Sequence, residues 1–507
     1  MTIINAGRFR YFVYLILILC VGCGGGSGGS DNQVASNSNN PSNDVPNQTP
    51  PNNETPNQTP PNNETPNQAP PNIPLGSITA FPGARGFGAY ASGGRGGKVL
   101  KVTNLNAAGT GSLQDALNQT GPRIIIFEVS GVITVDIIYI PHGDVTIAGQ
   151  TAPGAGITIE GRLYGAYDFG VNNIIIRHIR IRPPVFNNQS KGEQFDSVQL
   201  SRNSNIILDH VSMSFGVDET LDLYSARDVT VQWSTIEQSA LFGHPEANHN
   251  YGMINGPEGG RISVLNNLFA NFNRRAPALS VGPAETINNV MYNIKDNWVH
   301  HNAARGPFLV SNNYFKRGPS SSMTPIFLDA VSVGNELGYY FESNYVDDPV
   351  YLQGVLDPFS TASDHPSLQY VCEYFNGPDC RTFKLQNRPN FAFYSTYIAP
   401  IETNYSTAYD NVLKSSGAFP RDVVTETSVQ DVKARTGEWG ARIPANLLEG
   451  LQAKIAPLDT DNDGMSDDWE NSNGLDATNA SDQHSIMDTG YPAIEQYINE
   501  LADSLLQ

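Results

Sequence analysis

A short segment of alternating apolar and polar residues recurs along the middle of the chain, and this repeat limits the possible folds more than any other feature. An alternation with a period of two is typical of β-strands. Successive copies begin roughly 22 to 33 residues apart, a spacing expected of stacked repeat units. The repeat therefore predicts an all-β solenoid. Its copies are residues 173–181, 205–213, 228–233, 262–269, 286–291, 308–315 and 340–345.

Asparagine stands within the later copies of the repeat. Identical polar side chains can hydrogen-bond from coil to coil when the coils run parallel. A β-sandwich would instead need a hairpin turn about every 8 to 12 residues, and Asn-Gly and Asp-Gly turns are scarce here. We therefore expect residues 80–450 to form one right-handed parallel β-helix. The asparagines are Asn267, Asn289, Asn313 and Asn344.

A short helix is expected just before the solenoid. Ser112 fits the N-cap position and Asp115 the third position of a helix over residues 113–117. A helix at this place would cover one end of the stack. At the other end, residues 320–450 are rich in turn-forming residues, and we expect long loops and the last coils there.

The N-terminus has the composition of an export signal. Arg8 and Arg10 precede the apolar run 11–21, which is short for a membrane span. Gly22-Cys23 is similar to a bacterial lipoprotein cleavage site, so residues 1–22 are predicted to be removed and Cys23 to be lipidated. Plain cleavage with release of the protein is the alternative. We expect an outer-membrane or cell-surface lipoprotein, or a secreted protein.

Residues 23–79 are predicted to be a tether. They consist mainly of Gly, Ser, Asn and Pro, and too few apolar side chains are present to offset the entropy of ordering. The block 47–56 is repeated at 57–66, and its prolines favour an extended polyproline II chain. Contact with a membrane is expected only through the lipid anchor.

The charge of the chain excludes one class of partner. The net charge is −20, with 16% charged residues, and no basic run of the kind that binds nucleic acid is present. Such an acidic protein can hold a polyanion only through local arginines and bound cations. Cys372 and Cys380 are expected to form a disulfide in an oxidising compartment.

Three aspartates precede neighbouring copies of the repeat. Asp196 precedes the copy at 205, and Asp218 and Asp222 precede the copy at 228. Matching positions of adjacent coils lie about 4.8 Å apart, so these carboxylates could share a hard cation such as Ca²⁺. Alternatively, each aspartate makes only local hydrogen bonds in a turn. Arg275 follows one coil later and would face an anionic substrate.

Several stretches resemble the family 1 polysaccharide lyases, the pectate lyases. Residues 81–97, 102–106, 109–116 and 123–133 are similar to the opening of that family, and 205–210 resembles its strand motif ending in Asp-His. The resemblance covers about residues 81–319. It implies a monomeric, calcium-dependent enzyme that cleaves (1→4)-α-D-galacturonan, an acidic polysaccharide, by β-elimination into unsaturated oligogalacturonides.

The resemblance also implies roles for particular residues. Asp196, Asp218 and Asp222 match the primary calcium ligands, and Arg275 matches the catalytic arginine, whereas Asp209-His210 matches a structural motif. Elimination requires loss of the proton on C5, and a cation beside the uronate carboxylate stabilises the resulting charge. An arginine keeps its proton to about pH 12, so its spacing alone would make Arg275 a clamp for a substrate carboxylate.

The substrate-binding positions depart from the family pattern. Gln238 stands where many members have a substrate-binding lysine, and Ser280 replaces a second arginine. These changes are consistent with a preference for esterified pectin or another uronate polymer. We expect the substrate to contact Gln238 and four basic candidates, Arg274, Arg305, His244 and His249.

The C-terminal residues 451–507 are predicted to form a small calcium-binding module. Residues 459–470 fit the EF-hand loop template, with Gly464 at its sixth position and the carbonyl of Met465 as a further ligand. A helix is expected at 493–506. A solvated acidic linker is the alternative. The expected side-chain ligands are Asp459, Asp461, Asp463, Asp467 and Glu470.

Two other functions have to be weighed. A β-helical adhesin or carbohydrate-binding protein would need no catalytic residue, and the arginine and aspartates argue against it. A β-helical polygalacturonase would need a close set of carboxylates for acid and base roles, and its usual Asn-Thr-Asp and Gly-His-Gly runs are missing. The sequence therefore favours the lyase.

Overall fold

The computed structural model describes residues 78–167, 170–185, 195–246, 249–320, 322–333, 336–359, 380–389, 391 and 402–507. The signal peptide, Cys23, nearly all of the tether and Cys372 lie outside this part of the chain, so the expectations about them stay predictions. Cys380 is buried. Among the described helices none is long and apolar enough to cross a membrane.

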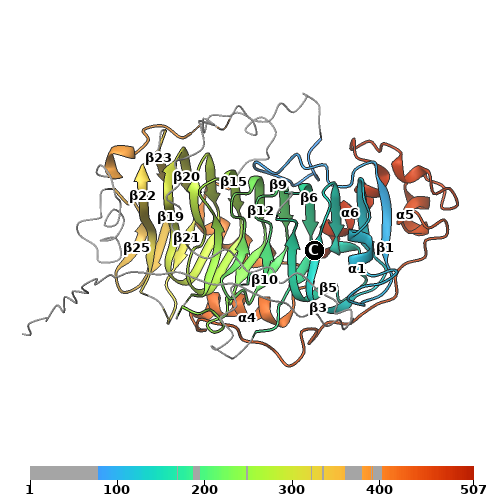
Figure 1. Cartoon of the computed structure of the whole chain (residues 1–507), viewed down its shortest axis with the longest axis horizontal. Helices are drawn as coiled ribbons and strands as arrows, with labels where there is room; N and C mark the ends of the chain where they lie inside the picture. Colours follow the sequence, from blue (N-terminus) through green and yellow to red (C-terminus); the bar gives the residue numbers. More distant parts are fainter. Residues whose placement is uncertain are drawn as a thin grey trace, which may run out of the picture. The chain divides into compact units, whose positions relative to one another are not determined.

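The strands form two large sheets in which neighbours come from successive turns of the chain (Figure 1). All strand pairs in the two sheets are parallel except the last, β24 with β25. The predicted stack of parallel coils is thus confirmed, and its right hand stays a prediction. The first sheet contains β1 (Lys98–Val102), β2 (Arg123–Phe127), β4 (Val145–Ala148), β6 (Asn172–Arg177), β9 (Ser204–Asp209), β12 (Arg227–Gln232), β15 (Gly260–Leu265), β18 (Ala284–Ile287), β20 (Pro307–Ser311) and β23 (Gly338–Glu342).

The second sheet carries the residues that matter most below. It contains β3 (Gly131–Ile140), β5 (Ile157–Gly165), β7 (Ile179–Ile181), β8 (Val198–Gln199), β10 (Ser212–Ser214), β11 (Glu219–Asp222), β13 (Thr235–Glu237), β14 (Tyr251–Asn255), β16 (Leu268–Arg274), β17 (Ala278–Val281), β19 (Val290–Arg305), β21 (Tyr314–Lys316), β22 (Thr324–Val333), β24 (Tyr345–Asp348) and β25 (Leu352–Val355).

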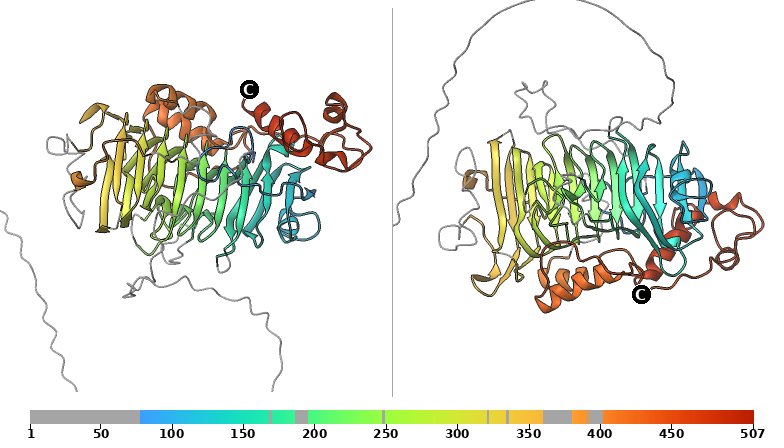
Figure 2. Two further views of the ribbon diagram at one scale, coloured as in Figure 1. Left: turned by 90° about the horizontal axis from the view of Figure 1, so that it is seen from above. Right: turned by 60° about the horizontal axis from the view of Figure 1, so that its bottom comes forward.

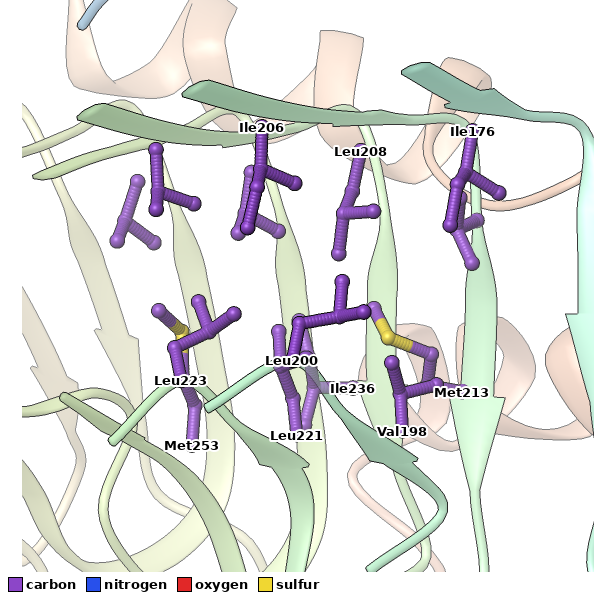
Figure 3. Close-up of a cluster of buried hydrophobic side chains, with 14 of the residues drawn as sticks. Ile176, Val198, Leu200, Ile206, Leu208, Met213, Leu221, Leu223, Ile236 and Met253 are labelled. Atoms are coloured by element: carbon purple, nitrogen blue, oxygen red, sulfur yellow. The ribbon is translucent and has the colours of Figure 1, made fainter. Parts of the chain in front are cut away.

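Apolar side chains of the two sheets meet inside the coils. Ile, Leu, Val and Met alternate with outward-facing residues along each strand, and the inward ones form one continuous core. Figure 3 shows residues from β6 and β9 facing residues from strands of the second sheet. Burial of this area is the main stabilising contribution. The labelled residues are Ile176, Ile206 and Leu208, and opposite them Val198, Leu200, Met213, Leu221, Leu223, Ile236 and Met253.

A recurrent corner joins the first sheet to the second. One residue at each corner has a positive φ, which asparagine tolerates better than most residues. Asn266, Asn288 and Asn312 occupy three successive corners with φ of 56°, 61° and 54°. The asparagine that follows each of them points into the stack. The frequent Asn-Asn pairs therefore combine a backbone role with a side-chain role.

The predicted asparagine ladder is confirmed. The side-chain amides of Asn267, Asn289 and Asn313 each donate to the side-chain oxygen of the next rung, at N–O distances of 3.0, 3.0 and 2.9 Å. Asn344 is the last rung, and all four side chains are fully buried. Each amide also donates to a backbone carbonyl of the preceding coil. The ladder satisfies buried polar groups that would otherwise be costly.

Helix α1 (Leu113–Leu117) forms at the expected residues. The hydroxyl of Ser112 accepts a hydrogen bond from the backbone of Asp115, and Leu113 and Leu117 join the core. The role of α1 as a cap of the stack stays a prediction.

The expectation of long loops over residues 320–450 is wrong for residues 405–415 and 423–434. Helices α3 (Tyr405–Ser415) and α4 (Val423–Ala434) form there and pack against β16 and β19 through a separate apolar cluster. The right-hand view of Figure 2 shows these two orange helices lying along the stack. They cover side chains of the second sheet that would otherwise be exposed.

A buried ion cluster holds α4 in place. Arg182, just after β7, donates to both carboxylate oxygens of Asp422, the N-cap of α4, at 2.9 and 3.0 Å. It also lies 3.3 Å from Glu237, and the side chains of all three residues are completely buried. Each charge thus has a partner inside the protein.

The C-terminal residues pack against the first strands. Helix α6 (Ala493–Leu505) shares an apolar cluster with β2, in which Ile494, Tyr497 and Ile498 contact Ile124 and Ile126. Figures 1 and 2 both show α6, in red, beside the blue and teal strands. Helix α5 (Asp467–Ser472) and the short 3-10 helix η5 (Asp482–His484) precede α6. The helix expected at 493–506 is confirmed, and the boundary at residue 450 stays a prediction.

Candidate functional site

Strand register brings the candidate residues into one row across the second sheet. Strand β11 lies between β8 and β14, with Asp222 opposite Gln199 and Glu219 opposite Tyr251. Tyr251 in turn is opposite Arg274 of β16. Asp196 lies three residues before Gln199, and one of its oxygens accepts a hydrogen bond from the backbone N–H of Glu219 at 3.0 Å. Residues distant in sequence thus become neighbours on successive coils.

Three carboxylates converge at this row. One oxygen each of Asp196, Asp218 and Glu219 lies within 4.8 Å of the other two. Such a set fits a hard divalent cation that takes six to eight oxygen ligands. Of the three expected ligands, the structure therefore brings Asp196 and Asp218 together directly, and it adds Glu219, which the sequence analysis did not single out.

Asp222 is connected to this cluster through Gln199. The amide of Gln199 donates to Asp196 at 3.3 Å and to Asp222 at 3.2 Å. The other contacts of Asp222 are the hydroxyl of Ser201 at 2.7 Å and the backbone N–H of Tyr224 at 2.6 Å. Asp222 is thus close to the other carboxylates but already holds three donors.

The crowding of negative charge shows in the pKa values. Burial, together with the charges of Asp222 and Asp218, holds the pKa of Asp196 well above its usual range. Burial also raises the pKa of Asp222. Burial would raise the pKa of Asp218 as well, but the hydrogen bond and charge of His249 outweigh it and lower that pKa. A bound cation would relieve this repulsion.

Arg275 supplies a positive charge beside the carboxylates. Its guanidinium forms an ion pair with Glu219 and lies 4.3 Å above the ring of Tyr251. The residue has a φ of 72°, and its backbone N–H donates to the carbonyl of Asp296 at 3.1 Å. The backbone at the end of β16 thus directs this side chain back toward β11.

Two of the four basic candidates also lie at the site. The Nε2 of His249 donates to Asp218 at 2.6 Å, and Nε2 of His244 lies 3.9 Å from the same oxygen. The two rings stack with centroids 3.7 Å apart, and the ring of His249 contacts Tyr251. These histidines orient Asp218 rather than stand free for substrate.

The other two basic candidates have partners within the fold. Arg274 lies 3.5 Å from the carboxylate of Asp296 and over the ring of Phe327. Arg305 donates to the backbone carbonyl of Pro257 at 2.9 Å. These partners lie outside the carboxylate cluster.

The expectation that Gln238 contacts substrate is wrong. Its side chain is completely buried beneath α4, where it donates to Ser428 at 3.0 Å and accepts from the backbone of Arg442 at 3.2 Å. The reason is that α4, absent from the sequence analysis, covers this position. Ser280 is likewise completely buried.

Asp209 and His210 have structural surroundings. Asp209 pairs with Arg177 at 2.8 Å and with His210 at 3.1 Å. Arg177 also donates to Asn499 of α6, and the ring of His210 stacks on that of His178. The motif therefore fastens α6 to the sheet, away from the carboxylate row.

A second group of carboxylates lies in the C-terminal residues. Oxygens of Asp459, Asp461 and Asp463 lie within 4.8 Å of one another, and so do oxygens of Asp463, Glu470 and Asp482. Burial and the neighbouring carboxylates raise the pKa of Asp463 to about 6 and that of Glu470 to about 8. Four of the five expected ligands are thus brought together.

Asp467, the fifth expected ligand, has a different place. Its two oxygens accept from the backbone N–H and the hydroxyl of Thr460, at 2.8 and 2.6 Å. Asp467 therefore closes the loop, and Asp482, which lies outside the loop template, takes part in the cluster instead.

Curated relatives decide the family. The chain is 33% identical to the probable pectate lyase C of Aspergillus terreus over 440 residues, which cover 84% of this chain and 95% of the relative. It is 34% identical to the probable pectate lyase C of Emericella nidulans over 441 residues, 84% of this chain and 93% of the relative. The chain belongs to the pectate lyase family. As a pectate lyase it is classed among the polysaccharide lyases.

The other comparisons add little to this assignment. No family model matches this pectate lyase. A solved structure of the thermostable pectate lyase PL 47 is 17% identical, with a TM-score of 0.47, and covers 68% of this chain and 99% of that one.

Proposed function

We propose that this pectate lyase cleaves (1→4)-α-D-galacturonan by calcium-dependent β-elimination at the row formed by Asp196, Asp218, Glu219 and Arg275. The observation that carries the proposal is the convergence of the three carboxylates within 4.8 Å, with the Arg275 guanidinium paired to one of them. Carboxylates that could hold a cation thus lie beside a basic side chain. Binding of an acidic polysaccharide requires both groups, because the strongly acidic protein would otherwise repel it.

The carboxylates would hold Ca²⁺ between the protein and the substrate. Asp196 and Asp218 are the main candidates, and Asp222 and Glu219 lie next to them. When bound, Ca²⁺ would draw negative charge from the uronate carboxylate and make the C5 proton more acidic. Around it, His249 orients Asp218, and Gln199 orients Asp196 and Asp222 by donating to both.

Arg275 is proposed as the catalytic residue. Its ion pair with Glu219 and its contact with Tyr251 fix the guanidinium at the edge of the carboxylate row. Contact with an anion favours the charged form of a guanidinium, so removal of the C5 proton requires Arg275 to leave Glu219. While paired, Arg275 can bind a substrate carboxylate.

The proposal is tested by product chemistry. The purified protein is incubated with polygalacturonate, and ultraviolet absorbance of the unsaturated product is followed with Ca²⁺ or with a chelator. A rise in absorbance that depends on Ca²⁺ supports the proposal. New reducing ends without absorbance would mean hydrolysis, and no product from pectate, esterified pectin or other uronates would mean a site used only for binding. Either of these last two results would overturn the proposed function.

Gln199 offers a test of the cation site that leaves every proposed ligand in place. Replacing Gln199 with alanine is expected to raise the Ca²⁺ concentration for half-maximal activity about 10- to 100-fold, since residues that orient metal ligands contribute about this much. The maximal rate at saturating Ca²⁺ should change far less. Gln119→Ala, at an exposed position, serves as the control, and an unchanged Ca²⁺ requirement in Gln199→Ala would contradict the assignment.

A further inference from the structure

The acidic cluster in the C-terminal residues has no role in the proposed elimination, and it differs from an ordinary acidic surface in its burial. Glu470 is completely buried and Asp463 is 2% exposed. Both carboxylate oxygens of Glu470, and one oxygen each of Asp461, Asp463 and Asp482, are buried without a hydrogen-bond partner. These oxygens belong to the groups that converge within 4.8 Å.

The loop itself aims these oxygens inward. In Asp461 and Asp463 one oxygen accepts a backbone N–H, from Asp463 at 3.2 Å and from Met465 at 2.9 Å. In each residue it is the other oxygen, Oδ2, that is buried without a partner. The local turns thus bind one oxygen of each carboxylate and leave the other oxygen directed toward the middle of the acidic cluster.

The charge of the cluster is not balanced by the protein. Lys101 of β1 pairs with Asp459 at 2.7 Å and with Glu128 at 2.9 Å. Within the described ranges no basic side chain pairs with Asp461, Asp463, Glu470 or Asp482. Carboxylates that are buried without partners are costly unless they bind a cation. A bound cation would balance this charge.

We propose that Asp459, Asp461, Asp463, Glu470 and Asp482 form a structural Ca²⁺ site that fastens the C-terminal residues to the first strands. All side-chain donors are oxygens, which suit Ca²⁺ better than Zn²⁺. Asp482 replaces Asp467 of the loop template, so the site joins η5 to the loop and to α5. This inference is independent of the proposed elimination chemistry.

The position of the site explains how one ion can hold this region. Met465, inside the loop, is buried in the cluster that α6 shares with β2. The ring of Trp469, next to Glu470, packs on Tyr497 of α6 with centroids 5.3 Å apart, and its Nε1 donates to Glu500 at 2.7 Å. Drawing the loop, α5 and η5 together around one ion therefore also fixes the surface against which α6 packs.

The test counts bound ions in the intact protein. Equilibrium dialysis against Ca²⁺, after removal of ions with a chelator, is compared for the wild type, Asp482→Asn and the control Asp467→Asn. We expect Asp482→Asn to bind one Ca²⁺ fewer per chain, or to bind it at least about tenfold more weakly, while Asp467→Asn keeps the wild-type number. Ca²⁺ should raise the unfolding temperature of the wild type and the control more than that of Asp482→Asn.

Clear results would overturn the inference. An unchanged Ca²⁺ count in Asp482→Asn would show that Asp482 is not a ligand. Loss of an ion in Asp467→Asn would show that Asp467 is the ligand, as in the loop template. Equal protection by Mg²⁺ alone would contradict the choice of Ca²⁺. Lyase activity is measured separately on the same samples, so a chain that binds the ion but cleaves nothing overturns the proposed function and leaves this inference standing.

Discussion

Replacing Arg275 with alanine is expected to lower kcat/KM on polygalacturonate by at least about 10²- to 10³-fold, the loss typical when a group that acts on the transition state is removed. Arg275 is the arginine that pairs with Glu219 of the carboxylate row. The adjacent Arg274 pairs instead with Asp296 and lies over the ring of Phe327. The measurement is the initial rate of absorbance increase at saturating Ca²⁺.

Two further variants separate the possible roles of Arg275. Arg274→Ala, at the adjacent position, should lose less than tenfold and controls for general damage. Arg275→Lys keeps a positive charge but loses the planar fork that binds a carboxylate in two places. An Arg275→Ala protein that is folded and keeps more than a tenth of the wild-type kcat/KM would show that another group performs the elimination.

The second large effect concerns stability. Replacing Arg182 with methionine is expected to lower the free energy of unfolding by about 3–5 kcal/mol, because removal of one partner leaves a buried charge uncompensated. Here Asp422 and Glu237 both lose their positive partner. The measurement is equilibrium unfolding in denaturant at neutral pH. Asp136→Asn breaks the ion pair of the exposed Asp136 with Arg162 and should cost less than about 1 kcal/mol.

The same cluster makes a prediction about pH. Burial alone would raise the pKa of Asp422, but the charge and hydrogen bonds of Arg182 outweigh it and lower that pKa. A lowered pKa stabilises the folded state above the unfolded value of about 3.9 and loses this contribution as the pH falls toward the folded value. The difference in unfolding free energy between the wild type and Asp422→Asn should therefore shrink below about pH 4. A constant difference would contradict the pairing.

The solenoid could be predicted because its signal repeats. Each copy shows the same alternation, and the second asparagine of each Asn-Asn pair forms the ladder that the pattern indicated. The backbone role of the first asparagine, at the corner, was missed, because residue type is the only sign of a positive φ in the sequence. Helix α4 was also missed, although Asp422 is a suitable N-cap and Val424, Ser428 and Val432 recur at helical spacing.

The site was predictable only in part because register is a property of the fold. Asp196 and Asp218 could be placed near each other from the repeat, whereas Glu219 and Gln199 join them through the pairing of β8 with β11. Gln238 occupies a family position, yet α4 covers it. Asp482 lies 12 residues beyond Glu470 in the sequence, and only the turn through η5 returns it to the loop.

The packing of α6 on β2 also sets an order of events during synthesis. A ribosome makes Ile124 and Ile126 about 370 residues before Ile494, which covers them together with Tyr497 and Ile498. Contacts between such distant parts of a chain form slowly because a long loop has to close first. Strand β2 therefore stays without its cover during translation, and the nascent chain keeps this part of its β-surface uncovered until α6 has left the ribosome.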